Sequence, residues 1–282
     1  MKLRKVLSIS RPHFWAYEAA TFVFFGAFLA TKGIEVLSSV NFWVFLLYFL
    51  VPANILIYGV NDIFDYETDK HNPKKVEYES LVEPKDRPAL YKYIFFTNIP
   101  FVIYAVFYDI NITALLYLFL FLFFAVFYSA PPIRAKARPF LDSFFSAGHY
   151  TVTGVFGYYL MGGQYINWLY VSAGFIWCVA MHAFSAVPDI QADTKANLET
   201  IATKLGKKYT IILCIVLYGL AGVFIYSAVL IALAISLVYI MVLGYCLFEK
   251  SDQGLFKIYT YFSYINVLSG GLIAMFLIYK AL

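Results

Sequence analysis

The chain has 282 residues, of which 62% are hydrophobic and only 13% are charged, and its mean hydropathy is +0.74. These values lie far from those of soluble globular proteins and exclude a water-soluble domain as the main fold. The formal net charge is only +4, and we expect no nucleic-acid partner. The composition indicates a polytopic membrane protein built from α-helices, because lipid offers no water to satisfy the backbone amides of other structures.

Nine apolar runs are each long enough to cross a hydrocarbon core about 30 Å thick, which needs roughly 20 helical residues. In chain order they cover residues 14–31, 40–60, 90–108, 112–128, 141–161, 168–187, 210–226, 228–248 and 258–279. No Gly-rich or Ser-rich linker divides them. We therefore expect an all-α fold with nine transmembrane helices in one bundle, around a central cavity open to the cytoplasmic side. We also expect a single domain over residues 1–282.

Basic residues are distributed unevenly between the two sides that these spans define. With the N-terminus inside, 19 of the 21 Lys and Arg residues fall on the cytoplasmic side, and only Lys32 and Lys280 fall outside. Cytoplasmic loops of membrane proteins hold such an excess of Lys and Arg. The sequence therefore predicts a multi-pass cell-membrane protein whose N-terminus lies in the cytoplasm.

Two acidic clusters follow long apolar runs, both on the predicted cytoplasmic side, at residues 61–69 and 189–193. In helical geometry each set of aspartates lines one face of its helix. The two sets are Asp62, Asp65 and Asp69, and then Asp189 and Asp193. Like charges this close repel one another unless a cation lies between them. Mg²⁺ is the natural candidate, because it takes one or two carboxylates and completes its shell with waters and phosphate oxygens.

A third cytoplasmic segment, Tyr128–Lys136 with the sequence YSAPPIRAK, lies between the acidic clusters. Its two prolines cannot continue a helix, so the fourth span is expected to end there. Arg134 can bind phosphate through a bidentate fork, and Lys136 can do so as a point charge. Two metal-binding clusters and a basic loop together predict a site for a diphosphate.

These segments resemble the motifs of the UbiA superfamily of intramembrane prenyltransferases. Residues 61–69 are similar to that family's N-D-x-x-D-x-x-x-D motif, residues 189–193 to its D-x-x-x-D motif, and residues 128–136 to its Y-S-x-P-P-x-R-x-K loop. The resemblance implies a prenyl diphosphate donor and two Mg²⁺ ions that bridge this donor to the Asp motifs. It also implies a hydrophobic acceptor that is alkylated within the bundle.

The chemistry of such a transfer assigns a role to each candidate residue. Ionisation of an allylic diphosphate leaves added negative charge on the leaving group, which metal ions neutralise as Lewis acids. The expected metal ligands are Asp62, Asp65, Asp69, Asp189 and Asp193. The expected diphosphate-binding residues are Asn61, Arg134 and Lys136, with Lys195 and Arg11 as weaker candidates. Tyr128 is expected to hydrogen-bond the donor or to face the allylic cation with its ring.

Shorter strings resemble the carotenoid branch of that family, the lycopene elongases, at residues 58–60, 72–75 and 182–189. This resemblance implies dimethylallyl diphosphate as the donor and attack by a terminal alkene of lycopene. The second motif departs from the commoner family form because Asn197 stands where Gly is frequent. An aromatic precursor of quinones or a glycerol-based lipid is the alternative acceptor.

A membrane transporter of cations or metabolites is the alternative from another functional class. Transporters hold coupling carboxylates near the bilayer midplane, whereas the clustered aspartates here lie at the cytoplasmic edge beside basic loops. This location favours phosphate chemistry. We interpret the long connector at residues 70–92 as a cap over the diphosphate, with a plain solvated loop as the alternative.

Several other polar residues fall in or next to the predicted spans. We expect His149 and His182 to make interhelical hydrogen bonds, and we expect Asp142 to pair with a basic residue among 134–138. Glu18 needs a partner that the sequence does not identify. The three cysteines have neither the spacing of a zinc site nor that of a disulfide framework, and we expect them to pack as small apolar residues.

Overall fold

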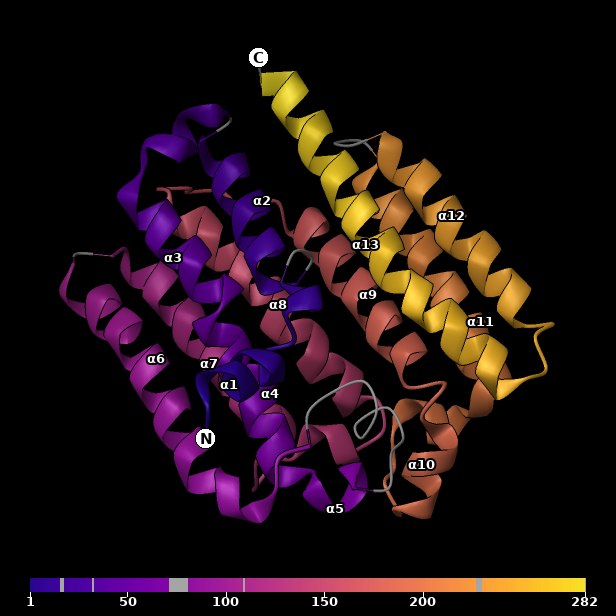
Figure 1. The fold of residues 1–282 in the computed structure, drawn as a ribbon. Coiled ribbons are helices and arrows are strands. Elements are labelled where there is room, and N and C mark those ends of the chain that lie inside the picture. The colour runs from indigo at the N-terminus through magenta and orange to yellow at the C-terminus, as the bar shows by residue number, and fades with distance from the viewer. Residues whose placement is uncertain (16–17, 32, 71–80, 109, 227–229, 282) are drawn as a thin grey trace. The chain divides into compact units, whose positions relative to one another are not determined.

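A computed structural model describes residues 1–15, 18–31, 33–70, 81–108, 110–226 and 230–281, and these residues form helices and no strand (Figure 1). The helices group into two compact units, Met1–Ala135 with Val152–Gln164, and Lys136–Thr151 with Tyr165–Leu282. The boundary falls within α8 (Leu141–Leu160), so its first half belongs to the second unit. The all-α prediction is confirmed, whereas the assignment of one domain stays a prediction.

Seven helical stretches among the described residues are long and apolar enough to cross a membrane. They are Pro12–Thr31, Val40–Phe64, Pro84–Phe107, Ile112–Ser129, Trp168–Ser185, Ile201–Ile225 and Gln253–Tyr279. The two remaining predicted spans are also helical, as α8 and α12 (Ile231–Cys246). Helix α12 has only 16 residues, and α8 carries buried polar side chains. The chain is therefore a multi-pass membrane protein, and the count of nine spans stays a prediction.

In its described residues, the first unit contains seven α-helices before its share of α8. They are α1 (Leu3–Ile9), α2 (Ala19–Thr31), α3 (Val40–Leu50), α4 (Pro52–Phe64), α5 (Tyr66–Asp69), α6 (Arg87–Phe107) and α7 (Ile112–Ser129). Helix α4 packs against α6, α7, α3 and α1. It is therefore held from several sides, and it leads directly into the first acidic motif.

A break separates α3 from α4 inside the second predicted span. Pro52 is the first residue of α4, and Val51 before it has φ −121° and ψ −66°. Proline has no N–H with which to continue the preceding helix. The Asn54 side-chain amide donates to the carbonyl oxygens of Phe49 (3.2 Å) and Leu50 (2.9 Å). These bonds satisfy carbonyls at the end of α3, which lets the break lie in an apolar environment.

Helix α2 packs backbone to backbone against the C-terminal part of α8. A Cβ atom added to Gly26 would lie 1.8 Å from the carbonyl oxygen of Gly154. The Thr153 hydroxyl donates a hydrogen bond of 3.1 Å to the carbonyl oxygen of Ala19. Small residues permit such close approach between membrane helices, where packing rather than the hydrophobic effect drives association. This contact holds α2 within the first unit.

Where the structure describes the second unit, it contains the first half of α8 and five further α-helices. They are α9 (Trp168–Ser185), α10 (Ile190–Lys195), α11 (Ile201–Ile225), α12 and α13 (Asp252–Ala281). Helix α11 lies beside α9 and α12 (Figure 1). At their contact the rings of Tyr218 and Tyr239 stack with centroids 4.4 Å apart. The cysteines Cys178, Cys214 and Cys246 are all buried thiols, as expected of small side chains that pack in the interior.

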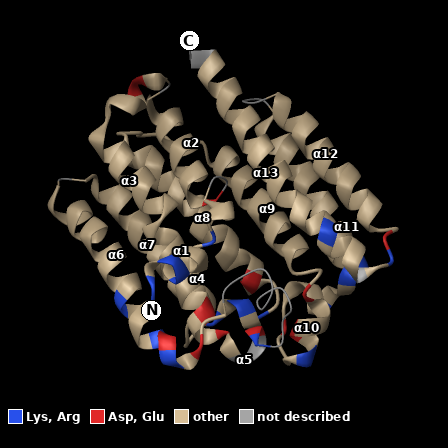
Figure 2. Cartoon of the chain, viewed as in Figure 1, with Lys and Arg blue, Asp and Glu red and all other residues tan. Residues whose placement is uncertain are grey.

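Charged residues gather at one end of each unit. Figure 2 shows them in the first unit around α5 and the start of α6, and in the second unit around α10, the start of α11 and the connection between α12 and α13. In the first unit, Lys5 of α1 forms an ion pair of 2.5 Å with Asp86, which directly precedes α6. Each unit therefore presents one polar end, and this end carries the acidic motif of that unit.

Candidate active site

The first acidic motif follows the last turn of α4 and covers two helical segments. Asp62, Asp65 and Asp69 are only 3%, 2% and 8% exposed. The prediction of one continuous helical face is wrong, because α4 ends at Phe64 and α5 begins at Tyr66. An acidic side chain is unfavourable at a helix C-terminus and favourable before an N-terminus. Asp65 lies at both, so the favourable position before α5 offsets the unfavourable position after α4.

Two neighbours reach the Asp62 carboxylate within the first unit. Arg11 Nη2 lies 3.4 Å from Asp62 Oδ1, and the Asn61 amide nitrogen lies 3.4 Å from the same oxygen. The Ser129 hydroxyl donates to Asn61 Oδ1 at 3.1 Å. The structure thus brings the predicted residues Asn61, Asp62 and Arg11 together. It also adds Ser129, which stands in the Y-S-x-P-P string but had no predicted role.

The buried carboxylates of this motif fit a bound cation. Burial of a carboxylate is costly unless it is paired or coordinates a metal. Three aspartates lie within eight residues, and each is less than 10% exposed. Carboxylate oxygens are the ligands that Mg²⁺ prefers, and one or two of them suffice when phosphate oxygens complete the shell. The residues present in the first unit therefore fit Mg²⁺.

The second acidic motif forms one turn at the start of α10. Asp189 directly precedes this helix, and the Asp193 N–H donates to the Asp189 carbonyl oxygen at 2.8 Å. The predicted i, i+4 spacing on a helical turn is confirmed. Asn197 ends the helix with φ 52°, and the next N–H, that of Leu198, bonds to the Asp193 carbonyl oxygen at 2.8 Å. Gly or Asn suits this left-handed position, which explains the residue that departs from the family pattern.

The electrostatics of the second motif also fit a cation. Burial raises the pKa of Asp193 to about 7, and the negative charge of Asp189 contributes to the rise. The positive charge of Lys136 opposes this shift without cancelling it, and Lys136 is itself 9% exposed. A divalent cation would stabilise a carboxylate whose ionised form is disfavoured by burial and by a neighbouring carboxylate. The predicted residues Asp189 and Lys136 therefore both act electrostatically on Asp193.

Asp142 at the start of α8 is held differently from the prediction. Its carboxylate accepts hydrogen bonds of 2.7 Å from the backbone N–H of Ser143 and from that of Ile201, the first residue of α11. Two backbone amides, rather than the expected basic residue, therefore hold this buried side chain. The Ser143 hydroxyl contacts His182 Nδ1 of α9 at 3.0 Å, which confirms the interhelical bond of His182. His149 instead contacts the Phe145 carbonyl oxygen of its own helix at 3.1 Å.

The basic loop has one cation with unsatisfied hydrogen-bonding capacity. Arg134 has φ 45°, and its buried Nε has no hydrogen-bond partner among the described residues. An anion with several acceptor oxygens would satisfy such a group. Tyr128 is half-buried in the last turn of α7, and Lys195 is exposed at the end of α10. Residues 71–80, which include part of the predicted cap and the string at 72–75, lie outside the described residues.

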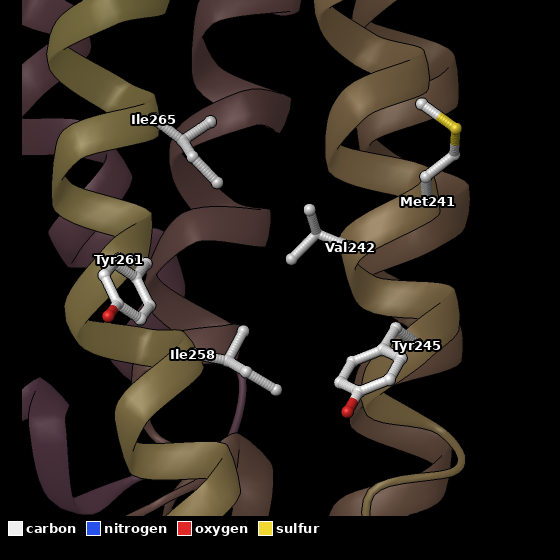
Figure 3. A pocket seen from close by; sticks show the side chains of 6 residues that line it. All are labelled: Met241, Val242, Tyr245, Ile258, Tyr261 and Ile265. Atoms are coloured by element: carbon white, nitrogen blue, oxygen red, sulfur yellow. The ribbon is translucent and has the colours of Figure 1, made fainter.

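No group of three or more His, Cys, Asp or Glu side chains that could hold a metal by itself occurs in the described part of the chain. A Mg²⁺ ion that shares its shell with a diphosphate does not need such a group. An open groove of about 400 Å³ lies between α12 and α13 (Figure 3). It is lined by Met241, Val242, Tyr245, Ile258, Tyr261 and Ile265. Because none of these side chains is charged, the groove does not suit a diphosphate.

Comparison with protein families matches residues 19–278 to the UbiA prenyltransferase family. Among curated proteins, the lycopene elongase/hydratase of Corynebacterium glutamicum is 36% identical over 228 residues, which cover 79% of this chain and 77% of that protein. The lycopene elongase/hydratase of Haloarcula japonica is 36% identical over 217 residues, which cover 77% of this chain and 72% of that protein.

Solved structures share the fold at lower identity. A UbiA homolog from Archaeoglobus fulgidus bound to GPP and Mg²⁺ has a TM-score of 0.69 and 18% identity, over 95% of this chain and 99% of that one. The apo structure of a UbiA homolog from Aeropyrum pernix has a TM-score of 0.71 and 17% identity, over 94% and 99% of the two chains. The predicted all-α membrane fold thus has solved counterparts.

Proposed function

Because the chain belongs to the UbiA prenyltransferase family, and is therefore a membrane prenyltransferase, we propose that it elongates lycopene on the path to a C50 carotenoid. One observation carries the choice of acceptor, which is the 36% identity to lycopene elongase/hydratases over nearly four-fifths of the chain. A further relative, from Dietzia, is a C(50) β-cyclic carotenoid biosynthesis protein and is 34% identical over 222 residues. The proposed donor is dimethylallyl diphosphate.

We propose that the two acidic motifs bind two Mg²⁺ ions. When bound, Mg²⁺ supplies Lewis-acid neutralisation of the diphosphate leaving group. The proposed ligands are Asp62, Asp65, Asp69, Asp189 and Asp193. Burial of the first three and the raised pKa of Asp193 support this assignment, because a bound cation stabilises a buried carboxylate.

The basic residues are proposed to hold the diphosphate while the allylic C–O bond breaks. The main binding residues are Arg134, whose buried Nε has no hydrogen-bond partner in the described part of the chain, and the buried residue Lys136. Arg11 beside Asp62 joins them, and Asn61 orients the site through its amide. Lys195 is a peripheral contact, because it is exposed at the end of α10. Tyr128 is proposed to face the allylic cation, to which an aromatic ring is attractive.

The diphosphate leaves with the electron pair of the C–O bond, and the terminal alkene of lycopene attacks the allylic cation. The new carbocation on the acceptor is then discharged by loss of a proton or by addition of water. The acceptor requires no deprotonation before attack, because an alkene is itself the nucleophile. We further propose that the N-terminus and both motifs face the cytoplasm, where water-soluble donors are available. The excess of Lys and Arg on that side supports this orientation.

Incubation of the purified protein with Mg²⁺, labelled dimethylallyl diphosphate and lycopene, followed by product mass analysis, tests this function. We expect lycopene adducts in steps of five carbons, and we expect their loss in Asp62→Ala and Asp189→Ala. Glu35→Gln, which changes an exposed acid outside both motifs, is the matched control and should retain activity. Transfer to an aromatic quinone precursor or a glycerol lipid, but not to lycopene, would keep the prenyltransferase and overturn the acceptor. A folded protein that releases no diphosphate from any donor would instead favour a transporter.

A further inference from the structure

Tyr58 of α4 contacts two residues of the N-terminal segment through different parts of its side chain. The Arg11 guanidinium carbon lies 4.2 Å from the centroid of the Tyr58 ring. The Tyr58 hydroxyl donates a short hydrogen bond to Glu18 Oε1. Tyr58 and Glu18 are only 7% and 4% exposed. Tyr58 is therefore the buried partner that Glu18 requires, and its ring is at the same time a platform for Arg11.

The same arginine reaches the first acidic motif. Tyr58 and Asp62 are four residues apart on α4, so they share one face of the helix. The Arg11 guanidinium lies over the Tyr58 ring while its Nη2 approaches Asp62 Oδ1 at 3.4 Å. The guanidinium is thus held at two points, by a ring below it and a carboxylate beside it. Cation–π contacts are stronger at sites shielded from water, and the Arg11 side chain is only 13% exposed.

The local backbone restrains Arg11 and Glu18, which both contact Tyr58. Arg11 has φ 52°, a left-handed conformation that is unfavourable for a residue with a Cβ and that recurs at functional sites. Its N–H donates to the Ser8 carbonyl oxygen at 3.1 Å. Glu18 directly precedes α2, where the helix N-terminus favours a carboxylate. Neither side chain therefore depends on a freely moving loop.

We propose that Tyr58 and Glu18 are positioning residues that hold the Arg11 guanidinium above the first acidic motif. The inference rests on the proposed function, in which Arg11 binds the donor's diphosphate. The ring of Tyr58 sets the height and tilt of the guanidinium, and the hydrogen bond to Glu18 fixes the ring. A hydroxyl that donates to a carboxylate also enriches its ring in electrons, which strengthens attraction to the arginine.

A double-mutant cycle on the full-length protein in detergent tests this positioning role. The readout is the Kd for inorganic diphosphate in the presence of Mg²⁺, measured by isothermal titration calorimetry. We expect Arg11→Ala to raise this Kd about tenfold and Tyr58→Leu to raise it roughly fivefold. In the Arg11→Ala background, Tyr58→Leu should add almost nothing, because no guanidinium is left to position. A general loss of stability would instead add its effect in both backgrounds.

Two milder variants separate the ring from its hydroxyl. Tyr58→Phe keeps the ring under Arg11 and should raise the Kd only about two- to threefold. If Tyr58→Leu does not fold, Tyr58→Phe replaces it in the double-mutant cycle with Arg11→Ala. Glu18→Gln keeps an acceptor oxygen for the hydroxyl and should stay close to the wild-type Kd, whereas Glu18→Ala should match Tyr58→Phe. The matched control is Tyr48→Phe in α3, which removes a buried hydroxyl with no hydrogen-bond partner among the described residues and should leave the Kd unchanged.

The outcomes distinguish a failure of the positioning role from a failure of the proposed prenyltransferase function. If Arg11→Ala weakens binding and Tyr58→Leu weakens it equally in both backgrounds, the positioning role is wrong while the proposed function stands. If Arg134→Ala weakens binding and Arg11→Ala does not, Arg11 does not bind diphosphate. The positioning role of Tyr58 and Glu18 is then wrong as well. A wild-type protein that binds no diphosphate with Mg²⁺ would overturn both.

Discussion

The Ser129 hydroxyl donates a hydrogen bond of 3.1 Å to the side-chain oxygen of Asn61 and so joins the end of α7 to the first acidic motif. The two residues are 68 positions apart in the chain. The amide nitrogen of Asn61 faces the other way and lies 3.4 Å from Asp62 Oδ1. Ser129 therefore fixes which end of the amide points at the aspartate, because it bonds the oxygen.

Ser129→Ala is expected to raise the KM for the prenyl diphosphate about fivefold, with a smaller effect on kcat. The lost hydrogen bond is worth about 1 kcal/mol, and without it the Asn61 amide can rotate away from Asp62. Steady-state kinetics with varied donor measure the effect. Ser263→Ala in α13 is the control, since that hydroxyl bonds only to the Thr260 carbonyl oxygen of its own helix. A KM equal to that of the control would contradict the role given to Ser129.

Binding of Mg²⁺ is expected to strengthen as the pH rises toward 7 and to level off above it. The pKa of Asp193 is about 7 because burial and the charge of Asp189 disfavour its ionised form. A proton on Asp193 competes with the metal, so the apparent affinity should rise by up to about tenfold per pH unit below this pKa. Titration calorimetry with Mg²⁺ alone at pH 6, 7 and 8 measures the profile directly.

Two substitutions should move this profile in opposite directions. Asp189→Asn removes a negative neighbour, which lowers the pKa of Asp193 and shifts the midpoint to lower pH. Lys136→Met removes a positive neighbour and shifts the midpoint to higher pH. Because the folded pKa lies above the model-peptide value of 3.8, the metal-free protein should also lose stability as the pH rises between these two values. A profile that is flat in pH would show that Asp193 is not a ligand.

Asp142→Ala is expected to destabilise the second unit by about 2–4 kcal/mol in the free energy of unfolding. Its carboxylate is 1% exposed and accepts the backbone N–H of Ser143 and of Ile201, so its loss leaves two buried donors unsatisfied. Asp142→Asn keeps one acceptor oxygen and should recover about half of the loss. Thermal unfolding in detergent, followed by circular dichroism, compares the variants. Equal unfolding temperatures for wild type and Asp142→Ala would refute this anchoring role.

The sequence predicted the helices well, because long apolar runs leave helix as the economical spanning structure. Every predicted span corresponds to a helix, although Pro52 divides the second one. The expected polar contacts were only partly correct. His182 bonds across helices, whereas His149 and Asp142 bond to backbone groups. A carboxylate in a sequence carries no sign of whether a cation or a backbone amide will reach it.

The contacts that the sequence did not predict depend on packing between distant segments. Glu18 clearly needed a partner, but Tyr58 is 40 residues away and many tyrosines were possible. Ser129 stood inside a motif, yet its hydrogen bond to Asn61 requires that α7 packs against α4. The break at Asp65 was not predicted, because the spacing of Asp62, Asp65 and Asp69 is also compatible with a continuous helix. Such features follow from tertiary structure, which composition and periodicity do not specify.

The contact between α2 and α8 yields a last prediction, for Gly26→Ala. The added Cβ would lie 1.8 Å from the Gly154 carbonyl oxygen, and backbone cannot move aside as a flexible side chain can. The helices must separate, and we expect a loss of about 3 kcal/mol or more in the free energy of unfolding. The matched control is Gly271→Ala in α13, whose Cβ would meet nothing within 4 Å. That change should stabilise the helix by about 0.5–1 kcal/mol, because alanine loses less backbone entropy than glycine. Thermal unfolding in detergent should therefore move in opposite directions for the two variants, and a common direction would contradict the close packing of α2 on α8.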